Sequence, residues 1–148
     1  MNTMEEILDY AIGQEEEAAS FYADLAQRAE KAGMKEILME FSAEEVRHKE
    51  RLLRVKQGES RLTANQEVMD LRIADYLVEI EATDNISYQD ALIVAMKREQ
   101  AAFRLYTDMA EKVSEAMLRE IFSGLAREEA KHKLFFESRY DEHVFADN

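Results

Sequence analysis

The stretch Glu45-Val46-Arg47-His48 recurs 84 residues later in the sequence as Glu129-Ala130-Lys131-His132. The same offset of 84 relates two isolated acids, Glu15 and Glu99. It also relates two tyrosines, Tyr22 and Tyr106, which follow those acids by seven residues. Residues 8–54 match residues 92–138 at 14 positions without a gap. Because the sequence holds only two copies, the pattern indicates a duplicated unit and not a solenoid of many repeats.

The composition around these motifs is typical of a helical protein. The 148 residues include no proline and only four glycines, so turn signals for a sheet are scarce. Apolar residues at helical spacing predict long helices over about residues 3–31, 34–57, 88–112 and 114–140. Thr3 and Ser87 are expected to cap helix starts, and Gly33 and Gly58 to end the first two helices.

Short breaks between the first and second helices, and between the third and fourth, imply two antiparallel hairpins. Residues 59–86 form a long connection between the hairpins, in which the apolar pattern from Asp70 to Ile80 predicts a shorter helix. The expected fold class is therefore all-α: a four-helix bundle of two duplicated hairpins with a long, partly helical crossover. A chain of this length is expected to form one domain over residues 1–148.

Each predicted helix has an apolar face that an acid or a histidine interrupts midway. Burying an ionised carboxylate costs several kcal/mol unless it is paired, protonated or bound to metal. Four carboxylates supply four negative charges, which two divalent cations balance if both histidines are neutral. The candidate metal ligands are Glu15, Glu45, His48, Glu99, Glu129 and His132.

A single Glu-x-x-His pair in a glutamate-rich helix would usually lie on the surface. Here the pair is duplicated, lies on the apolar face, and uses two of the three histidines. Residues three apart lie about 4.5 Å apart along a helix axis, so each glutamate points into the same space as its histidine. Tyr22 and Tyr106 are interpreted as donors that orient a ligating carboxylate, with plain core aromatics as the alternative.

Several classes of protein are disfavoured by composition. A formal charge of −13 disfavours nucleic acid binding, which needs a basic surface, and favours cations. The absence of cysteine excludes disulfides and thiolate metal sites from this chain. The sequence contains no run of about 18 apolar residues, the length that would be needed to span a membrane. The acidic N-terminal stretch does not read as a signal peptide, so a cytoplasmic location is expected.

The arrangement resembles the ferritin-like di-iron carboxylate proteins, most closely their rubrerythrin-like branch. The residues that carry the resemblance are Glu15 leading to Tyr22, Glu99 leading to Tyr106, and the two Glu-x-x-His pairs. The resemblance implies two iron ions, with manganese as an alternative, bridged by Glu45 and Glu129. Glu15 and His48 would complete the ligands of one ion, and Glu99 and His132 would complete those of the other. It further implies a cytoplasmic oxidoreductase of oxidative stress defence that reduces peroxide or dioxygen while cycling between di-ferrous and di-ferric states.

Two departures from the family pattern limit what carries over. An extra glutamate, expected one turn from Glu99, is replaced by Ala95, Met96, Ala102 and Phe103. Without cysteine the chain holds no rubredoxin domain, so electrons would come from an external donor such as a rubredoxin-like protein or a flavoprotein reductase. A ferroxidase or iron-storage protein and a non-enzymatic metal-binding bundle stay open as alternatives. The resemblance also implies a homodimer.

Overall fold

The computed structural model describes residues 1–59, 68–78 and 86–145. The chain divides into two compact units, Met1–Ile73 and Ala74–Asn148. The prediction of one domain over residues 1–148 stays a prediction. In the described part of the chain, no helix is both long enough and apolar enough to cross a membrane.

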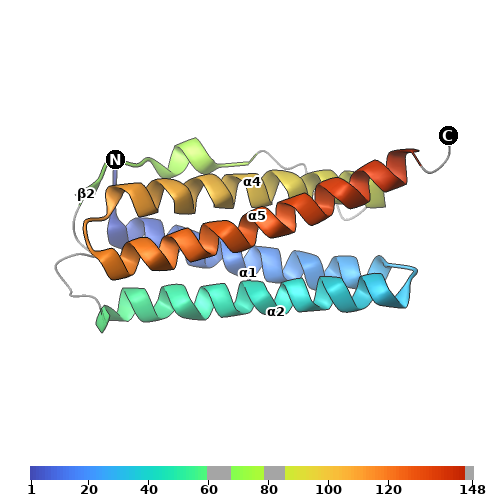
Figure 1. Cartoon of the computed structure of the whole chain (residues 1–148), viewed down its shortest axis with the longest axis horizontal. Helices are drawn as coiled ribbons and strands as arrows, with labels where there is room; N and C mark the ends of the chain where they lie inside the picture. The colour runs from blue at the N-terminus through green and yellow to red at the C-terminus, as the bar shows by residue number, and fades with distance from the viewer. Residues whose placement is uncertain (60–67, 79–85, 146–148) are drawn as a thin grey trace. The chain divides into compact units, whose positions relative to one another are not determined.

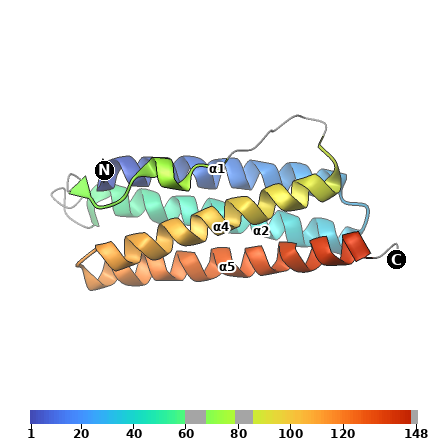
Figure 2. The ribbon, with the colours of Figure 1, turned by 90° about the horizontal axis from the view of Figure 1, so that it is seen from above.

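The N-terminal unit is a helical hairpin. Its helices are α1 (Met4–Arg28) and α2 (Ala32–Arg54), which run side by side in Figures 1 and 2. Thr3 begins α1 with a complete capping box: its hydroxyl accepts from the Glu6 N–H at 3.1 Å, and its own N–H donates to the Glu6 carboxylate at 2.9 Å. The hydrogen bond from the Thr3 N–H lowers the pKa of the Glu6 carboxyl. The chain leaves α1 through extended backbone at Ala29 and enters α2 from extended backbone at Lys31.

Three polar contacts join α1 to α2 and the turn after it, at positions seven residues apart. The Ser42 hydroxyl donates to the Ala19 carbonyl at 2.7 Å. The Lys49 ammonium lies 2.9 Å from the Glu16 carboxylate, and Lys56, just after α2, pairs with Asp9. The partners on α1 come in the reverse order, which fixes the antiparallel register of the hairpin. Because surface ion pairs contribute little free energy, the buried side chains between the helices supply most of the stability.

A short strand pair ties the chain's first residues to the crossover. Strand β1 (Asn2–Thr3) pairs antiparallel with β2 (Val68–Met69). The Asn2 N–H also donates to the Leu71 carbonyl, and its side-chain oxygen accepts from the Ile73 N–H, both at 3.0 Å. A single-turn 3₁₀ helix, η2 (Ile73–Tyr76), follows.

The C-terminal unit holds the second hairpin, formed by α4 (Tyr88–Lys112) and α5 (Ala116–Phe145). The Ser87 hydroxyl caps α4 by accepting from the Asp90 N–H at 3.0 Å. The two helices lie side by side in both views (Figures 1 and 2). Large apolar side chains fill the unit and are almost wholly buried, among them Leu92, Met109, Phe122, Leu125 and Phe136.

The prediction of four long helices is confirmed, with shifted ends. The break after the first helix lies at Ala29–Lys31, and Gly33 falls inside the first turn of α2, where a backbone N–H needs no helical partner. After Arg54, α2 widens into a π-helical turn, η1 (Val55–Glu59), in which Gly58 has a positive φ of 94°. Only glycine adopts this conformation without strain, so the predicted break at Gly58 is confirmed.

The prediction of a helix from Asp70 to Ile80 is wrong for the described residues, which form only the 3₁₀ turn Ile73–Tyr76. The physical reason is the strand pair: the Leu71 carbonyl, which a helix would need, accepts from the Asn2 N–H instead. The Asn2 side chain also accepts from the Ile73 N–H. Residues 79 and 80 of the predicted helix lie outside the described residues.

Candidate metal centre

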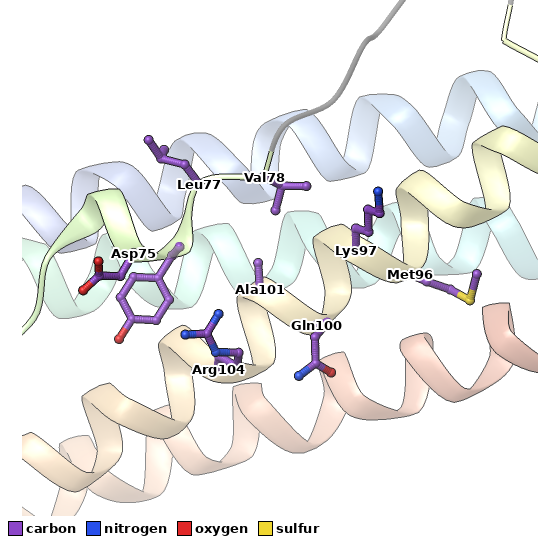
Figure 3. A pocket seen from close by; sticks show the side chains of 9 residues that line it. Asp75, Leu77, Val78, Met96, Lys97, Gln100, Ala101 and Arg104 are labelled. Carbon is purple, nitrogen blue, oxygen red and sulfur yellow. The ribbon is translucent and has the colours of Figure 1, made fainter.

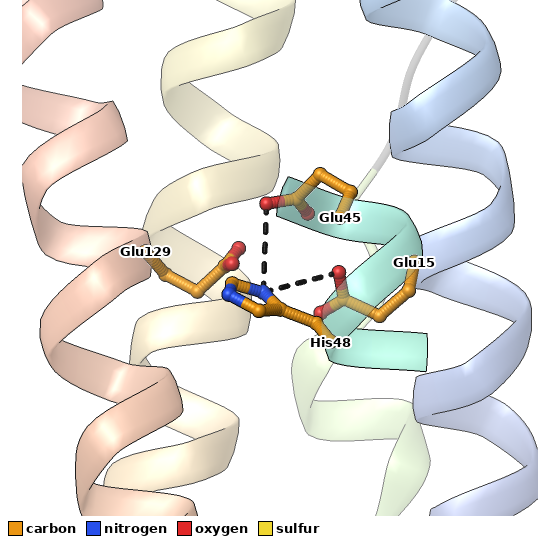
Figure 4. Close-up of side chains that lie close together, drawn as sticks. All are labelled: Glu15, Glu45, His48 and Glu129. Carbon is orange, nitrogen blue, oxygen red and sulfur yellow. Dashed lines mark ion pairs between the residues drawn. The ribbon is translucent and has the colours of Figure 1, made fainter. Parts of the chain in front are cut away.

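The N-terminal unit brings together three of the predicted ligands, Glu15 from α1 and Glu45 and His48 from α2. Each offers one ligand atom, and these atoms lie within 4.8 Å of one another. The His48 Nδ1 atom lies 3.5 Å from Glu15 Oε2 and 3.6 Å from Glu45 Oε1, the contacts dashed in Figure 4. We call these three residues the N-terminal ligand set.

The C-terminal unit repeats this arrangement with Glu99 from α4 and Glu129 and His132 from α5. Their ligand atoms also lie within 4.8 Å of one another, and His132 Nδ1 lies 3.7 Å from Glu99 Oε1. We call these three residues the C-terminal ligand set. The 84-residue offset in the sequence therefore corresponds to the same local geometry in both hairpins.

Both sets are buried to an extent that carboxylates rarely reach. All four glutamates and both histidines expose 2% of their surface or less. Charged side chains are almost never fully buried unless they are paired or bind metal. Each set contains two carboxylates and one imidazole, so one divalent cation would make it formally neutral with a neutral histidine.

The chemistry of the donors fits a hard or borderline divalent metal. Carboxylate oxygens suit magnesium, manganese and ferric iron, and imidazole suits zinc and ferrous iron. A site of mixed carboxylates and imidazole, without thiolate, is therefore suited to iron or manganese. Both ligand sets accommodate this chemistry equally well, because they offer the same atoms.

Two contacts that the sequence analysis missed position the N-terminal ligand set. Ser42, whose hydroxyl bonds to the Ala19 carbonyl, lies one turn before Glu45. The ion pair between Lys49 and Glu16 directly follows His48 on one helix and Glu15 on the other. These bonds hold the backbones that carry the ligands in register. No sequence signal marks them, because a serine or a lysine at these positions is ordinary on a helix.

The two predicted orienting tyrosines are core residues. Tyr22 is fully buried and packs edge-on against Phe21 and Phe41, with ring centroids at 5.9 and 6.3 Å. Tyr106 is likewise buried, with 1% of its surface exposed. The burial agrees with either interpretation made from the sequence, so an orienting role stays a prediction.

Comparison with known proteins identifies the family. The family model described as Rubrerythrin matches residues 6–140, which is most of the chain. The chain belongs to the rubrerythrin family. All six candidate ligands lie inside the matched range. A search of curated proteins finds no match.

Solved structures place this rubrerythrin-family chain in its fold. A ferritin-like diiron-carboxylate protein of Thermotoga maritima is 17% identical and has a TM-score of 0.79, with 95% of this chain and 96% of that chain covered. A hypothetical protein of Pyrococcus furiosus is 24% identical with a TM-score of 0.73, over 96% of this chain and 90% of that chain. At these identities the likeness shows the fold alone. The prediction of an all-α, ferritin-like fold built from two helical hairpins is confirmed.

Proposed function

We propose that this chain binds two iron ions and acts as a di-iron oxidoreductase that reduces peroxide or dioxygen. The observation that carries the proposal is the pair of matching, buried ligand sets, each with two carboxylates and one imidazole. Membership of the rubrerythrin family supports iron as the metal. Manganese remains the alternative, since the donors discriminate little between the two.

The chain's own residues would bind and neutralise the metal, and their burial would keep bulk water from it. When bound, iron would supply the redox chemistry by cycling between di-ferrous and di-ferric states. The assignment of Glu45 and Glu129 as bridges, and of the other four ligands as terminal, rests on the family resemblance. A cytoplasmic location and a homodimer likewise rest on sequence interpretation.

The chain contains no cysteine and so no thiolate-bound electron carrier of its own. We therefore infer that a separate protein, rubredoxin-like or a flavoprotein reductase, supplies the electrons. The same absence favours ferroxidase activity as a second candidate function, because ferrous iron would then be its own electron source. Storage of the product would need a closed shell of many subunits, which a molar mass in solution would reveal.

The test begins with metal analysis of the purified protein and of protein reloaded with ferrous iron under anaerobic conditions. We expect about two irons per chain and an optical spectrum that changes on addition of peroxide. A reduced electron carrier that restores the original spectrum after each addition of peroxide, over several cycles, would support the oxidoreductase. A spectrum that changes once and is not restored by the carrier would favour the ferroxidase. A chain that binds iron but does not oxidise with either peroxide or air would overturn both.

Variants of the ligands test the proposed bridges. Glu45→Ala and Glu129→Ala should lose more metal than Glu15→Ala and Glu99→Ala, because a bridge serves both ions. Metal content near two per chain in all four variants would rule out the proposed ligands. Glu44→Ala provides the matched control, since it removes a carboxylate that adjoins Glu45 but is not a candidate ligand.

A further inference from the structure

The C-terminal unit carries a cleft beside α4, and the candidate ligand Glu99 on that helix is not part of its lining. The cleft has a volume of about 420 Å³ and lies between α4 and residues 75–78, the end of η2 and the segment after it (Figure 3). Sites for small molecules usually measure about 300–1,000 Å³, so the cleft is large enough for one. None of the six candidate metal ligands lines it.

The lining combines apolar side chains with two cations. Leu77, Val78 and Ala101 supply apolar surface, and Lys97 and Arg104 supply positive charge. Figure 3 shows Lys97 and Asp75 toward opposite ends of the cleft, with Arg104 between them. Asp75, the one carboxylate of the lining, is therefore not placed to neutralise Lys97.

The chain holds 32 acids against 19 lysines and arginines. Some of its cations pair with these carboxylates, as Lys49, Lys56 and Lys133 do. Within the described ranges, by contrast, neither Lys97 nor Arg104 forms an ion pair. Their charges are thus available to an anion that enters the cleft.

Arg104 is held in place by its neighbours. Its guanidinium lies 5.5 Å from the centroid of the Tyr76 ring, a cation–π contact. The Tyr76 hydroxyl in turn donates to the Asp108 carboxylate, one helical turn beyond Arg104. Burial and this hydrogen bond to Asp108 raise the pKa of Tyr76, so the ring stays neutral and keeps its donor. Arg104 is therefore a positioned cation, whereas the long side chain of Lys97 can adapt to what binds.

We propose that this cleft binds a small organic anion with an apolar body. The acidic group would contact the Arg104 guanidinium and the Lys97 ammonium, since charge-assisted hydrogen bonds to such groups are the strongest available at a surface. The apolar body would cover Ala101, Leu77 and Val78. Leu77 is 63% exposed, so a bound ligand would remove a large apolar side chain from water.

The site can be tested with a matched pair of fluorescent probes, the anion 1-anilinonaphthalene-8-sulfonate and the uncharged N-phenyl-1-naphthylamine. We expect saturable binding of the sulfonate to the folded full-length protein, and weaker binding of the uncharged probe. Lys97→Gln combined with Arg104→Gln should weaken sulfonate binding about tenfold and leave the uncharged probe unchanged. Ala101→Phe, which fills the cleft without changing charge, should weaken the binding of both probes.

The control is the double variant Lys35→Gln with Arg119→Gln, which removes two exposed cations from α2 and α5 and has the same net charge. It should bind the sulfonate as the natural protein does. Far-ultraviolet circular dichroism and a melting curve show that each variant is folded. Equal sulfonate affinity in the cleft variants and the control, or equal affinity for the charged and uncharged probes, would overturn the proposal. Neither result depends on iron, so the proposed function is tested separately.

Discussion

Substitution of Glu15 by glutamine should have opposite effects on the metal-free and metal-loaded protein. In the N-terminal ligand set two carboxylates face one imidazole, so with a neutral His48 nothing within the set balances the two negative charges. Carboxylate atoms of Glu15 and Glu45 lie within 4.8 Å of each other. At an effective dielectric constant of about 20, two unit charges at that separation repel by about 3.5 kcal/mol.

Glutamine keeps the shape of the side chain and removes that repulsion. Because a buried glutamine amide also costs free energy, we expect metal-free Glu15→Gln to gain about 1–2 kcal/mol, which raises Tm by about 3–6 °C for a chain of this size. With metal bound, we expect the natural protein to be more stable than the variant. At a free metal concentration of about 100 times Kd, the natural protein gains about 2.7 kcal/mol, and the variant should lose most of that gain.

The assay is thermal denaturation followed by circular dichroism, first in a chelator and then with excess ferrous or manganous ion in the absence of oxygen. Glu36→Gln is the matched control, because Glu36 is an exposed glutamate of α2 outside both ligand sets, and it should change neither melting curve appreciably. A metal-free Glu15→Gln protein that is less stable than the natural one would refute the argument from repulsion. An undiminished metal-induced rise in Tm would show that Glu15 is not a ligand.

Three further predictions concern the fold. Thr3→Ala removes the hydroxyl of the capping box and should cost about 1 kcal/mol in urea denaturation; no loss would mean that water replaces the cap. Phe122→Ala empties a fully buried position and should cost about 3–5 kcal/mol, and a loss below about 1 kcal/mol would contradict the packing described. Tyr76→Phe should cost about 1.5 kcal/mol at neutral pH. Because the pKa of Tyr76 is raised in the folded state, its contribution is complete below the ordinary value of 10.0 and is lost as pH rises above it. The variant should therefore show a flatter decline of stability above pH 10.0, and equal slopes would argue against the bond to Asp108.

The ligand sets could be predicted from sequence because helical periodicity is local. The spacing of Glu45 and His48 on one turn follows from helix geometry alone, and the apolar residues around Glu15 required that face to be buried. The 84-residue repeat then extended the same reasoning to the second hairpin. Burial of all six residues agrees with this interpretation.

The crossover could not be predicted in the same way, because its structure depends on partners far away in the sequence. Leu71 and Ile73 belong to a stretch whose apolar pattern suits a helix. In the structure, however, the Leu71 carbonyl and the Ile73 N–H form hydrogen bonds with Asn2. The cleft beside α4 was missed for a related reason. Lys97 and Arg104 look like ordinary exposed cations in the sequence, and only the position of residues 75–78 beside the helix gives them a shared concave surface.

The strand pair at the N-terminus has a consequence for the order of folding. The hairpin of α1 and α2 joins segments close in sequence, so its loop-closure entropy is small and it can form early. Strand β1, in contrast, meets β2 across more than sixty residues, although the two strands together contain only four residues. So few interactions cannot offset the entropic cost of closing so long a loop until the hairpin of α1 and α2 has formed. Pairing of Asn2 with Met69 should thus be a late event, absent from the transition state, so that changes at Asn2 alter the unfolding rate and leave the folding rate nearly constant.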